Sequence, residues 1–134
     1  MKKVVFVCVH NSGRSQMAEA FAKRLGEGKI KAVSAGTAPA DNLNPTVVEV
    51  MNEIGYDMSG HYPKVLTAGM VKDAERIITM GCGVDEGVCP AGFLVTEDWG
   101  LDDPHGQPIE KVCEIRDQIK AKVEKLVSEL NAEG

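Results

Sequence analysis

Residues 3–15 read Lys-Val-Val-Phe-Val-Cys-Val-His-Asn-Ser-Gly-Arg-Ser, an apolar run that passes directly into a short polar loop. The run at residues 3–9 is rich in β-branched side chains and has the length of a buried parallel strand. Residues 15–25 then change to the apolar spacing of a helix. The apolar residues on its expected inner face are Met17, Ala18, Phe21, Ala22 and Leu25. This stretch therefore predicts a strand, a tight loop and a helix, which together form the repeating unit of an α/β fold.

The rest of the chain continues the alternation of strand and helix patterns. Further strands are predicted at residues 29–35, 75–80 and 93–96, and further helices at residues 45–54, 67–73 and 109–130. Asn44 and Pro45 are typical of the N-cap and the first position of the helix that follows them. Strands that alternate with helices require right-handed crossovers, which produce a parallel sheet covered on both faces. We therefore expect one α/β domain over residues 1–134, with a four-stranded parallel sheet and helices on both faces.

The composition limits the classes of partner that we expect. The chain has 134 residues, 43% of them hydrophobic, and a formal net charge of −5 at pH 7. An acidic balance disfavours nucleic acid and acidic membrane surfaces, because both select for basic patches. No leader segment or long apolar run is evident, and so we expect a cytoplasmic protein. A small acidic domain of this kind is expected to be a monomer.

The loop after the first strand gathers the residue types of an oxyanion site. In a parallel sheet, ligands bind at the carboxyl ends of the strands, and Cys8 is expected at such an end. A helix N-terminus attracts anions and lowers a thiol pKa, while Arg14 adds a fixed charge and Gly13 permits a tight turn. Ser15 is positioned to donate to the thiolate and Asn11 to brace the loop. Taken alone, Cys8 is more simply interpreted as a small buried apolar residue and Arg14 as a solvated helix residue. Their joint placement favours Cys8 as a nucleophile.

The spacing of these residues resembles that of a known family. A cysteine, five residues, an arginine and a serine after an N-terminal strand is similar to the low-molecular-weight protein tyrosine phosphatase fold. Residues 15–19 (Ser-Gln-Met-Ala-Glu), 34–36 (Ser-Ala-Gly) and 44–45 (Asn-Pro) resemble the thioredoxin-coupled arsenate reductase branch of that fold more closely. The resemblance covers nearly the whole chain.

The segment of residues 99–104, Trp-Gly-Leu-Asp-Asp-Pro, is the candidate source of a general acid. Aspartate and proline also favour turns. A turn and a general acid are compatible here, because catalytic groups often lie on loops. The resemblance implies that the acid is Asp103, which directly precedes the proline. Tyrosine phosphatases usually carry a pair of tyrosines after this Asp-Pro, whereas this chain has His105 and Gly106. That departure weakens the phosphotyrosine interpretation.

Two later cysteines distinguish a reductase from a phosphatase. Cys82 and Cys89 bracket a glycine-containing segment after the third predicted strand, at the same sheet edge as Cys8. A phosphatase needs no further cysteine, whereas a reductase needs two electrons, which thiols supply through successive disulfides. Their spacing matches the redox segment of the arsenate reductases. A zinc site shared with Cys113 or His61 is disfavoured by that spacing, and Cys113 is expected to have no role.

The resemblance implies a complete reaction. Arsenate binds in the loop formed by Val9, His10, Asn11, Ser12, Gly13 and Arg14. The Cys8 thiolate attacks arsenic while Asp103 protonates the leaving oxygen, and Cys82 then attacks Cys8 to release arsenite. Cys89 moves the disulfide to Cys82–Cys89, where thioredoxin or a similar thiol donor reduces it. No tightly bound cofactor is implied.

Some related reductases hold a potassium ion beside this loop. Asn11, Glu19 and Ser34 match three of the four residues around that ion, but Lys64 stands at the fourth position. An ammonium group there takes the place of the ion, or Lys64 is only a surface lysine. We expect no metal and weak potassium stimulation.

Two other functions stay open at this point. A phosphatase that forms a phosphocysteine at Cys8 uses the same Arg14 and Asp103 on phosphate, whose shape and charge resemble those of arsenate. A non-enzymatic oxyanion-binding or redox-sensing module needs the loop but no general acid, so Asp103 speaks against it.

Overall fold

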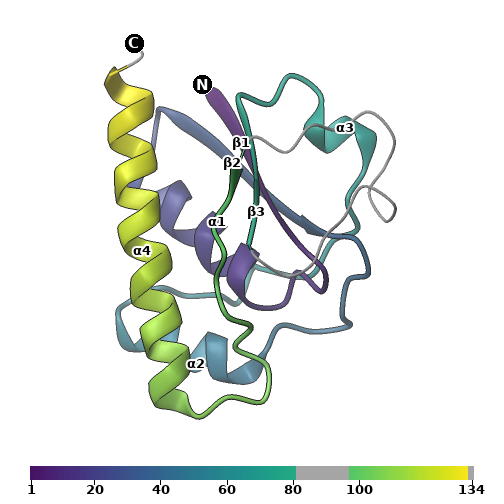
Figure 1. Ribbon diagram of the computed structural model, residues 1–134, viewed down its shortest axis with the longest axis vertical. Coiled ribbons are helices and arrows are strands. Elements are labelled where there is room, and N and C mark those ends of the chain that lie inside the picture. The colour runs from purple at the N-terminus through teal and green to yellow at the C-terminus, as the bar shows by residue number, and fades with distance from the viewer. Residues whose placement is uncertain (81–96, 133–134) are drawn as a thin grey trace.

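The computed structural model describes residues 1–80 and 97–132, and the statements below concern those residues. Its elements follow the order β1 (Lys2–Cys8), α1 (Arg14–Leu25), β2 (Ile30–Gly36), α2 (Pro45–Glu53), α3 (Ala68–Val71), β3 (Arg76–Thr79), β4 (Glu97–Asp98) and α4 (Ile109–Ala132) (Figure 1). Every predicted element within the described residues is present, with bounds that differ from the prediction by at most two residues. The predicted strand at residues 93–96 lies outside the described residues.

The sheet is parallel throughout and places β1 in its interior. The strand order is β2-β1-β3-β4, and each neighbouring pair runs parallel. β1 pairs with β2 over its whole length, from Lys2 opposite Ile30 to Cys8 opposite Gly36. The predicted four-stranded parallel sheet is therefore confirmed. Cys8 stands at the carboxyl end of an interior strand, which is where ligands bind in folds of this kind.

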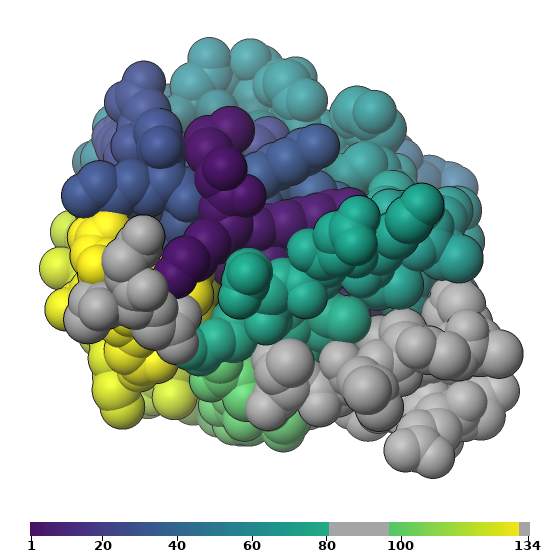
Figure 2. Space-filling model, turned by 90° about the horizontal axis from the view of Figure 1, so that it is seen from above, coloured from purple at the N-terminus to yellow at the C-terminus, as the bar shows by residue number. Residues whose placement is uncertain are grey.

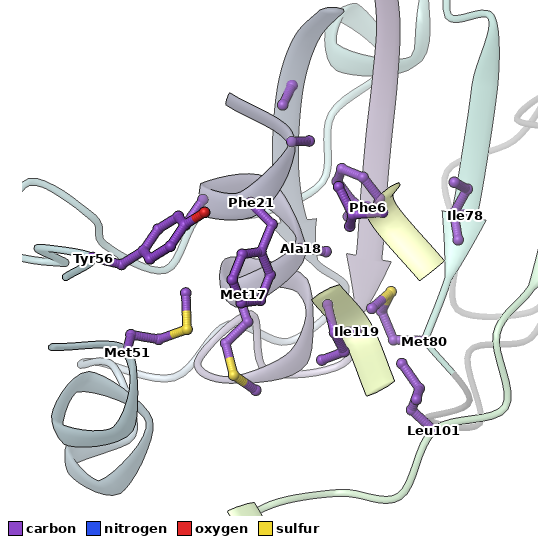
Figure 3. Packing of buried hydrophobic residues seen from close by; sticks show 14 of the residues in the cluster. Phe6, Met17, Ala18, Phe21, Met51, Tyr56, Ile78, Met80, Leu101 and Ile119 are labelled. Atoms are coloured by element: carbon purple, nitrogen blue, oxygen red, sulfur yellow. The ribbon is translucent and has the colours of Figure 1, made fainter. Parts of the chain in front are cut away.

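Alternate residues of β1 face two different cores, because successive side chains of a strand point to opposite faces. Phe6 belongs to the core that α1 and α4 cover, together with Phe21 and Ile119 (Figure 3). Val7 faces the other side, where it packs with Leu66 and the residues around α3. Helices thus cover both faces, as the sequence predicts, and α1 and α4 form the thicker layer (Figure 1).

A single apolar stripe holds α4 against the rest of the molecule. Its buried residues are Val112, Ile115, Ile119, Val123, Leu126 and Leu130. Each such side chain contributes roughly 1.5–3 kcal/mol when it leaves water. Near the end of α4, Lys2 Nζ donates to Leu130 O at 3.1 Å, so the start of β1 lies beside the last turns of α4 (Figures 1 and 2). None of the described helices combines the length and apolar character needed to cross a membrane.

The start of α2 is tied to the loop that follows β1. The Asn44 side chain accepts a hydrogen bond from the N–H of Thr46 at 2.9 Å, and Pro45 occupies the first helical position, as predicted. Such a cap stabilises a helix by about 1 kcal/mol. The backbone N–H of Asn44 donates to Ser12 O at 2.9 Å, which attaches α2 to the oxyanion loop (residues 9–14).

Candidate active site

Cys8 ends β1 almost fully buried, with two hydrogen-bonding groups beside its sulfur. The backbone N–H of Asn11 donates to Cys8 Sγ at 3.2 Å, and Ser15 Oγ lies 3.1 Å from the same atom. Asn11 Nδ2 donates to Ser15 Oγ at 2.7 Å, so the hydroxyl proton of Ser15 is available to the sulfur. Hydrogen bonds donated to a sulfur favour its thiolate form, which is the nucleophilic one.

The oxyanion loop depends on an unusual backbone conformation at Asn11. This residue is fully buried and has a φ of 51°, in the left-handed region that few residues other than glycine adopt. Its Oδ1 accepts from the N–H of Lys64 at 2.9 Å and from Gln16 Nε2 at 3.0 Å. A left-handed residue costs about 1–3 kcal/mol, least for asparagine, and these hydrogen bonds offset that cost. Asn11 thus lies where the sequence expects a brace for the loop.

Arg14 is the first residue of α1, and one of its nitrogens is already bound. Nη1 donates to Met80 O at 3.1 Å and to Leu101 O at 2.8 Å, and only 5% of the residue is exposed. Met80 follows β3 and Leu101 leads into the segment that carries Asp103; both side chains point into the same part of the core (Figure 3). The two carbonyls orient the guanidinium before any anion arrives, which reduces the entropy lost on binding.

The two neighbouring aspartates of residues 102–103 have different partners. Asp102 Oδ2 lies 2.8 Å from Lys111 Nζ, and this hydrogen bond holds the pKa of Asp102 below its ordinary value. Asp103 Oδ1 accepts from the backbone N–H of His105 at 2.9 Å, which closes a turn, while Oδ2 lies 3.8 Å from Arg14 Nη2. The turn and the position beside Arg14 are therefore compatible, and Asp103 rather than Asp102 faces the oxyanion loop.

These residues enclose one cavity of about 270 Å³ at the carboxyl end of the sheet. It is lined by Cys8, His10, Ser12, Gly13, Arg14, Ala40, Asn44, Asp103, Pro104 and His105. Gly13 stands at the N-cap of α1, and among the described residues no side chain caps this helix. The first N–H groups of α1 are thus available to an anion in the cavity.

Gln16 contacts the oxyanion loop through Asn11, and His61 contacts Gln16; neither was predicted as a site residue. Gln16 is fully buried in the second half of the first turn of α1, and His61 Nδ1 lies 3.1 Å from its Oε1. In the sequence, Gln16 stands out only as part of the motif at residues 15–19, and His61 only as a possible zinc ligand. A polar residue inside an otherwise apolar helix pattern is the signal that points to Gln16; His61 has no comparable signal.

Two lysines and His61 surround the buried carboxylate of Glu19. Its oxygens lie 3.1 Å from His61 Nδ1, 3.4 Å from Lys23 Nζ and 3.9 Å from Lys64 Nζ. Burial raises the pKa of Glu19, but the His61 hydrogen bond and the two lysine charges outweigh it and leave that pKa below its ordinary value. Burial also lowers the pKa of Lys64, more than the facing carboxylate raises it.

Lys64 stands at the fourth of the positions that the sequence resemblance links to a potassium ion. Its ammonium group lies 3.9 Å from Glu19 Oε1, and its positive charge disfavours a further cation beside that carboxylate. The Ser34 hydroxyl is buried and has no hydrogen-bond partner among the described residues. No group of three or more metal-ligating side chains occurs within residues 1–80 and 97–132.

Among the described residues, the one other cysteine is Cys113, which does not line the cavity. Cys82 and Cys89 lie outside the described residues. Cys113 lies on α4, where its Sγ is 4.0 Å from Glu53 Oε2 on α2. Met80, the last described residue before Cys82, accepts a hydrogen bond from Arg14 Nη1 at 3.1 Å.

Comparison with known proteins places this geometry in a family. The sequence profile of the low molecular weight phosphotyrosine protein phosphatases matches residues 3–134. The chain belongs to this family. Within it, the glutaredoxin arsenate reductase of Synechocystis sp. (strain ATCC 27184 / PCC 6803 / Kazusa) is 42% identical over 135 residues, which cover 98% of this chain and 100% of that protein.

Solved structures of related proteins have the same fold. An arsenate reductase in the phosphate-binding state superposes with a TM-score of 0.84 at 41% identity, over 97% of this chain and 99% of that chain. The thioredoxin-dependent arsenate reductase of Corynebacterium glutamicum gives a TM-score of 0.83 at 33% identity, over 100% of this chain and 64% of that one. The resemblance seen in the sequence is therefore confirmed at the level of the family and the fold.

Proposed function

We propose that this family member is an arsenate reductase. The observation that carries the proposal is that Cys8, Arg14 and Asp103 line a single cavity at the N-terminus of α1. The cavity offers a nucleophile, a fixed positive charge and a carboxyl group to one tetrahedral oxyanion. The identity of 42% to a glutaredoxin arsenate reductase supports arsenate as that oxyanion.

The first step joins arsenic to the protein. The oxyanion binds to the N–H groups of residues 9–14 and to Arg14. The Cys8 thiolate attacks arsenic, one As–O bond breaks, and the departing hydroxide takes a proton from Asp103 and leaves as water. Oδ1 of Asp103 accepts from the His105 N–H, and Oδ2 lies 3.8 Å from Arg14 Nη2, so we assign proton donation to Oδ2, the oxygen on the side of the bound oxyanion.

The second step reduces the arsenic. The Cys82 thiolate attacks the Cys8 sulfur, the S–As bond breaks, and its electron pair stays on arsenic, which leaves as arsenite. Cys89 then attacks Cys82, which frees the Cys8 thiolate and leaves a Cys82–Cys89 disulfide. These two assignments rest on the sequence, because both cysteines lie outside the described residues.

An external thiol donor completes the cycle. A dithiol protein of the thioredoxin or glutaredoxin class reduces the Cys82–Cys89 disulfide, and no tightly bound cofactor takes part. The thioredoxin-dependent and glutaredoxin relatives support this class of donor. Thiols of this kind persist in a reducing compartment, so we place the protein in the cytoplasm, acting as a monomer.

Hydrolysis of phosphomonoesters is the second candidate function. The family as a whole is described by its phosphotyrosine phosphatases, and Cys8, Arg14 and Asp103 suit a phosphocysteine intermediate equally well. His105 lines the cavity where an aromatic wall would be expected for phosphotyrosine. We therefore expect only weak phosphatase activity.

The test is arsenite formation from arsenate with thioredoxin, thioredoxin reductase and NADPH. We expect sustained turnover that Cys82→Ser abolishes and that the matched variant Cys113→Ser leaves intact. Hydrolysis of an aryl phosphate that survives Cys82→Ser, without any arsenite, would instead establish a phosphatase. Unchanged arsenite turnover in Cys82→Ser would overturn the disulfide relay.

A further inference from the structure

The Gln16 side chain is buried completely, yet every polar atom of its amide has a partner. The two N–H groups of Nε2 are shared among three acceptors: Tyr62 O at 2.8 Å, Asn11 Oδ1 at 3.0 Å and Asn11 O at 3.1 Å. Oε1 lies 3.1 Å from His61 Nδ1. A buried amide without partners would cost several kcal/mol, so this network fixes the position of Gln16 as well as satisfying it.

The residue that Gln16 holds is the one that contacts the nucleophile. Asn11 directs its backbone N–H at Cys8 Sγ and its Nδ2 at Ser15 Oγ, which in turn contacts the sulfur. Both donations depend on the left-handed conformation of Asn11, because φ sets the orientation of its N–H relative to its side chain and carbonyl. Gln16 binds that carbonyl and the side-chain oxygen together, and so it opposes relaxation to a commoner conformation.

We propose that Gln16 is a positioning residue for the nucleophile: it holds Asn11 in the left-handed conformation that aims two hydrogen-bond donors, directly and through Ser15, at Cys8. Gln16 does not line the cavity, and it acts only through Asn11. Gln16 Oε1 faces His61 Nδ1, which also lies 3.1 Å from Glu19 Oε2, so that Nε2 is the end of the amide that faces the three oxygens. The proposal rests on Cys8 being the reactive thiol of the proposed function.

The test measures the reactivity of Cys8 without arsenate. In a chain with Cys82, Cys89 and Cys113 replaced by serine, the rate of Cys8 alkylation by iodoacetamide is followed from pH 4 to pH 10. Gln16→Met keeps the length and volume of the side chain but removes its donors. We expect the apparent thiol pKa to rise, so that alkylation near neutral pH slows by about tenfold while the rate at high pH stays the same.

The matched control is Gln118→Met, an exposed glutamine on α4, whose profile should equal that of the parent chain. Urea unfolding of each variant separates this effect from a loss of stability. If Gln16→Met does not fold, the pH profile of Cys8 alkylation is measured on Gln16→Leu instead. A folded Gln16 variant that titrates like Gln118→Met would show that Gln16 only fills space and would overturn the proposal. Since iodoacetamide needs no general acid or relay, a failure to make arsenite leaves this result unaffected.

Discussion

α1 and α4 pack against the same face of the sheet, yet they bury different kinds of side chain. Among the described residues, α4 buries apolar residues alone. The first two turns of α1 also bury four polar residues: Arg14, Ser15, Gln16 and Glu19. Burying polar groups costs free energy unless each finds a partner. Arg14 binds the carbonyls of Met80 and Leu101, and Ser15 accepts from Asn11. Gln16 and Glu19 find partners within residues 61–64. α4 therefore stabilises the fold, whereas the start of α1 organises the site.

The largest effect on activity is expected from Arg14→Lys at the start of α1. Lysine keeps the charge but cannot reach both backbone carbonyls and still present two parallel donors to an oxyanion. We expect kcat/KM for arsenate to fall by up to about 10³-fold. Activity is compared per folded molecule, because the carbonyls of Met80 and Leu101 also lose a buried partner. Arg24→Lys, on the exposed side of the same helix, is the control and should retain activity. Near-normal turnover in Arg14→Lys would remove bidentate binding from the mechanism.

The opposite result is expected from Ile119→Ala on α4. Ile119 is fully buried in the larger core, and truncation leaves a cavity. The free energy of unfolding should fall by about 3 kcal/mol, while kcat per folded molecule stays unchanged. Lys120→Ala, at the neighbouring exposed position, should change neither quantity. Urea unfolding and steady-state kinetics measure the two effects separately. A large fall in kcat of folded Ile119→Ala would contradict the view that α4 stabilises the fold without organising the site.

The fold was predictable because its elements follow simple periods. The spacing of Ile115, Ile119 and Val123 alone predicts α4, and Asn44 with Pro45 predicts the start of α2. The composition of the oxyanion loop was also sufficient to suggest Cys8 and Arg14, since few other roles explain both at this spacing.

The contacts that orient the site were not predictable in the same way. Arg14 binds the carbonyls of Met80 and Leu101, which are 66 and 87 residues away in the sequence. Any residue supplies a backbone carbonyl, so no side-chain type marks these acceptors. Gln16 and His61 were missed for a related reason, because they meet across 45 residues and neither belongs to a pattern of period two or 3.6.

A smaller effect is expected where the acid loop (residues 101–105) touches α1. A Cβ added at Gly13 would lie 2.9 Å from Pro104 Cγ, so Gly13→Ala must displace the residue next to Asp103. We expect kcat to fall by about tenfold, since small misplacements of a catalytic group are costly. The double variant Gly13→Ala/Pro104→Ala should recover most of the loss relative to Pro104→Ala. Gly60→Ala, which meets nothing within 4 Å, is the control. Absence of rescue would locate the strain in the oxyanion loop itself.

Glu19 should make stability depend on pH at the start of α1. Its pKa is lower in the folded chain than the ordinary value of 4.5, so its stabilising contribution is complete above that value. The contribution is lost as the pH falls through the lower folded pKa. As the pH falls below 5, the free energy of unfolding of Glu19→Gln should therefore decrease less than that of the parent chain. The variant Glu124→Gln, at an exposed position, should behave like the parent. Urea midpoints across this range test the difference, and parallel curves for Glu19→Gln and parent would contradict it.

The smallest effect is expected from potassium. Lys64 Nζ lies 3.9 Å from Glu19 Oε1 and supplies a positive charge beside it, so replacing sodium with potassium at constant ionic strength should change kcat/KM little. Lys64→Asp removes this charge and places a second carboxylate near Glu19, which should raise the pKa of Glu19 and make activity respond to potassium. A strong response of the parent chain would mean that Lys64 does not replace the ion. The buried Ser34 hydroxyl would then be the first group to examine as a ligand. Stability of α4 should be indifferent to the cation in either chain, because its core contains no charge.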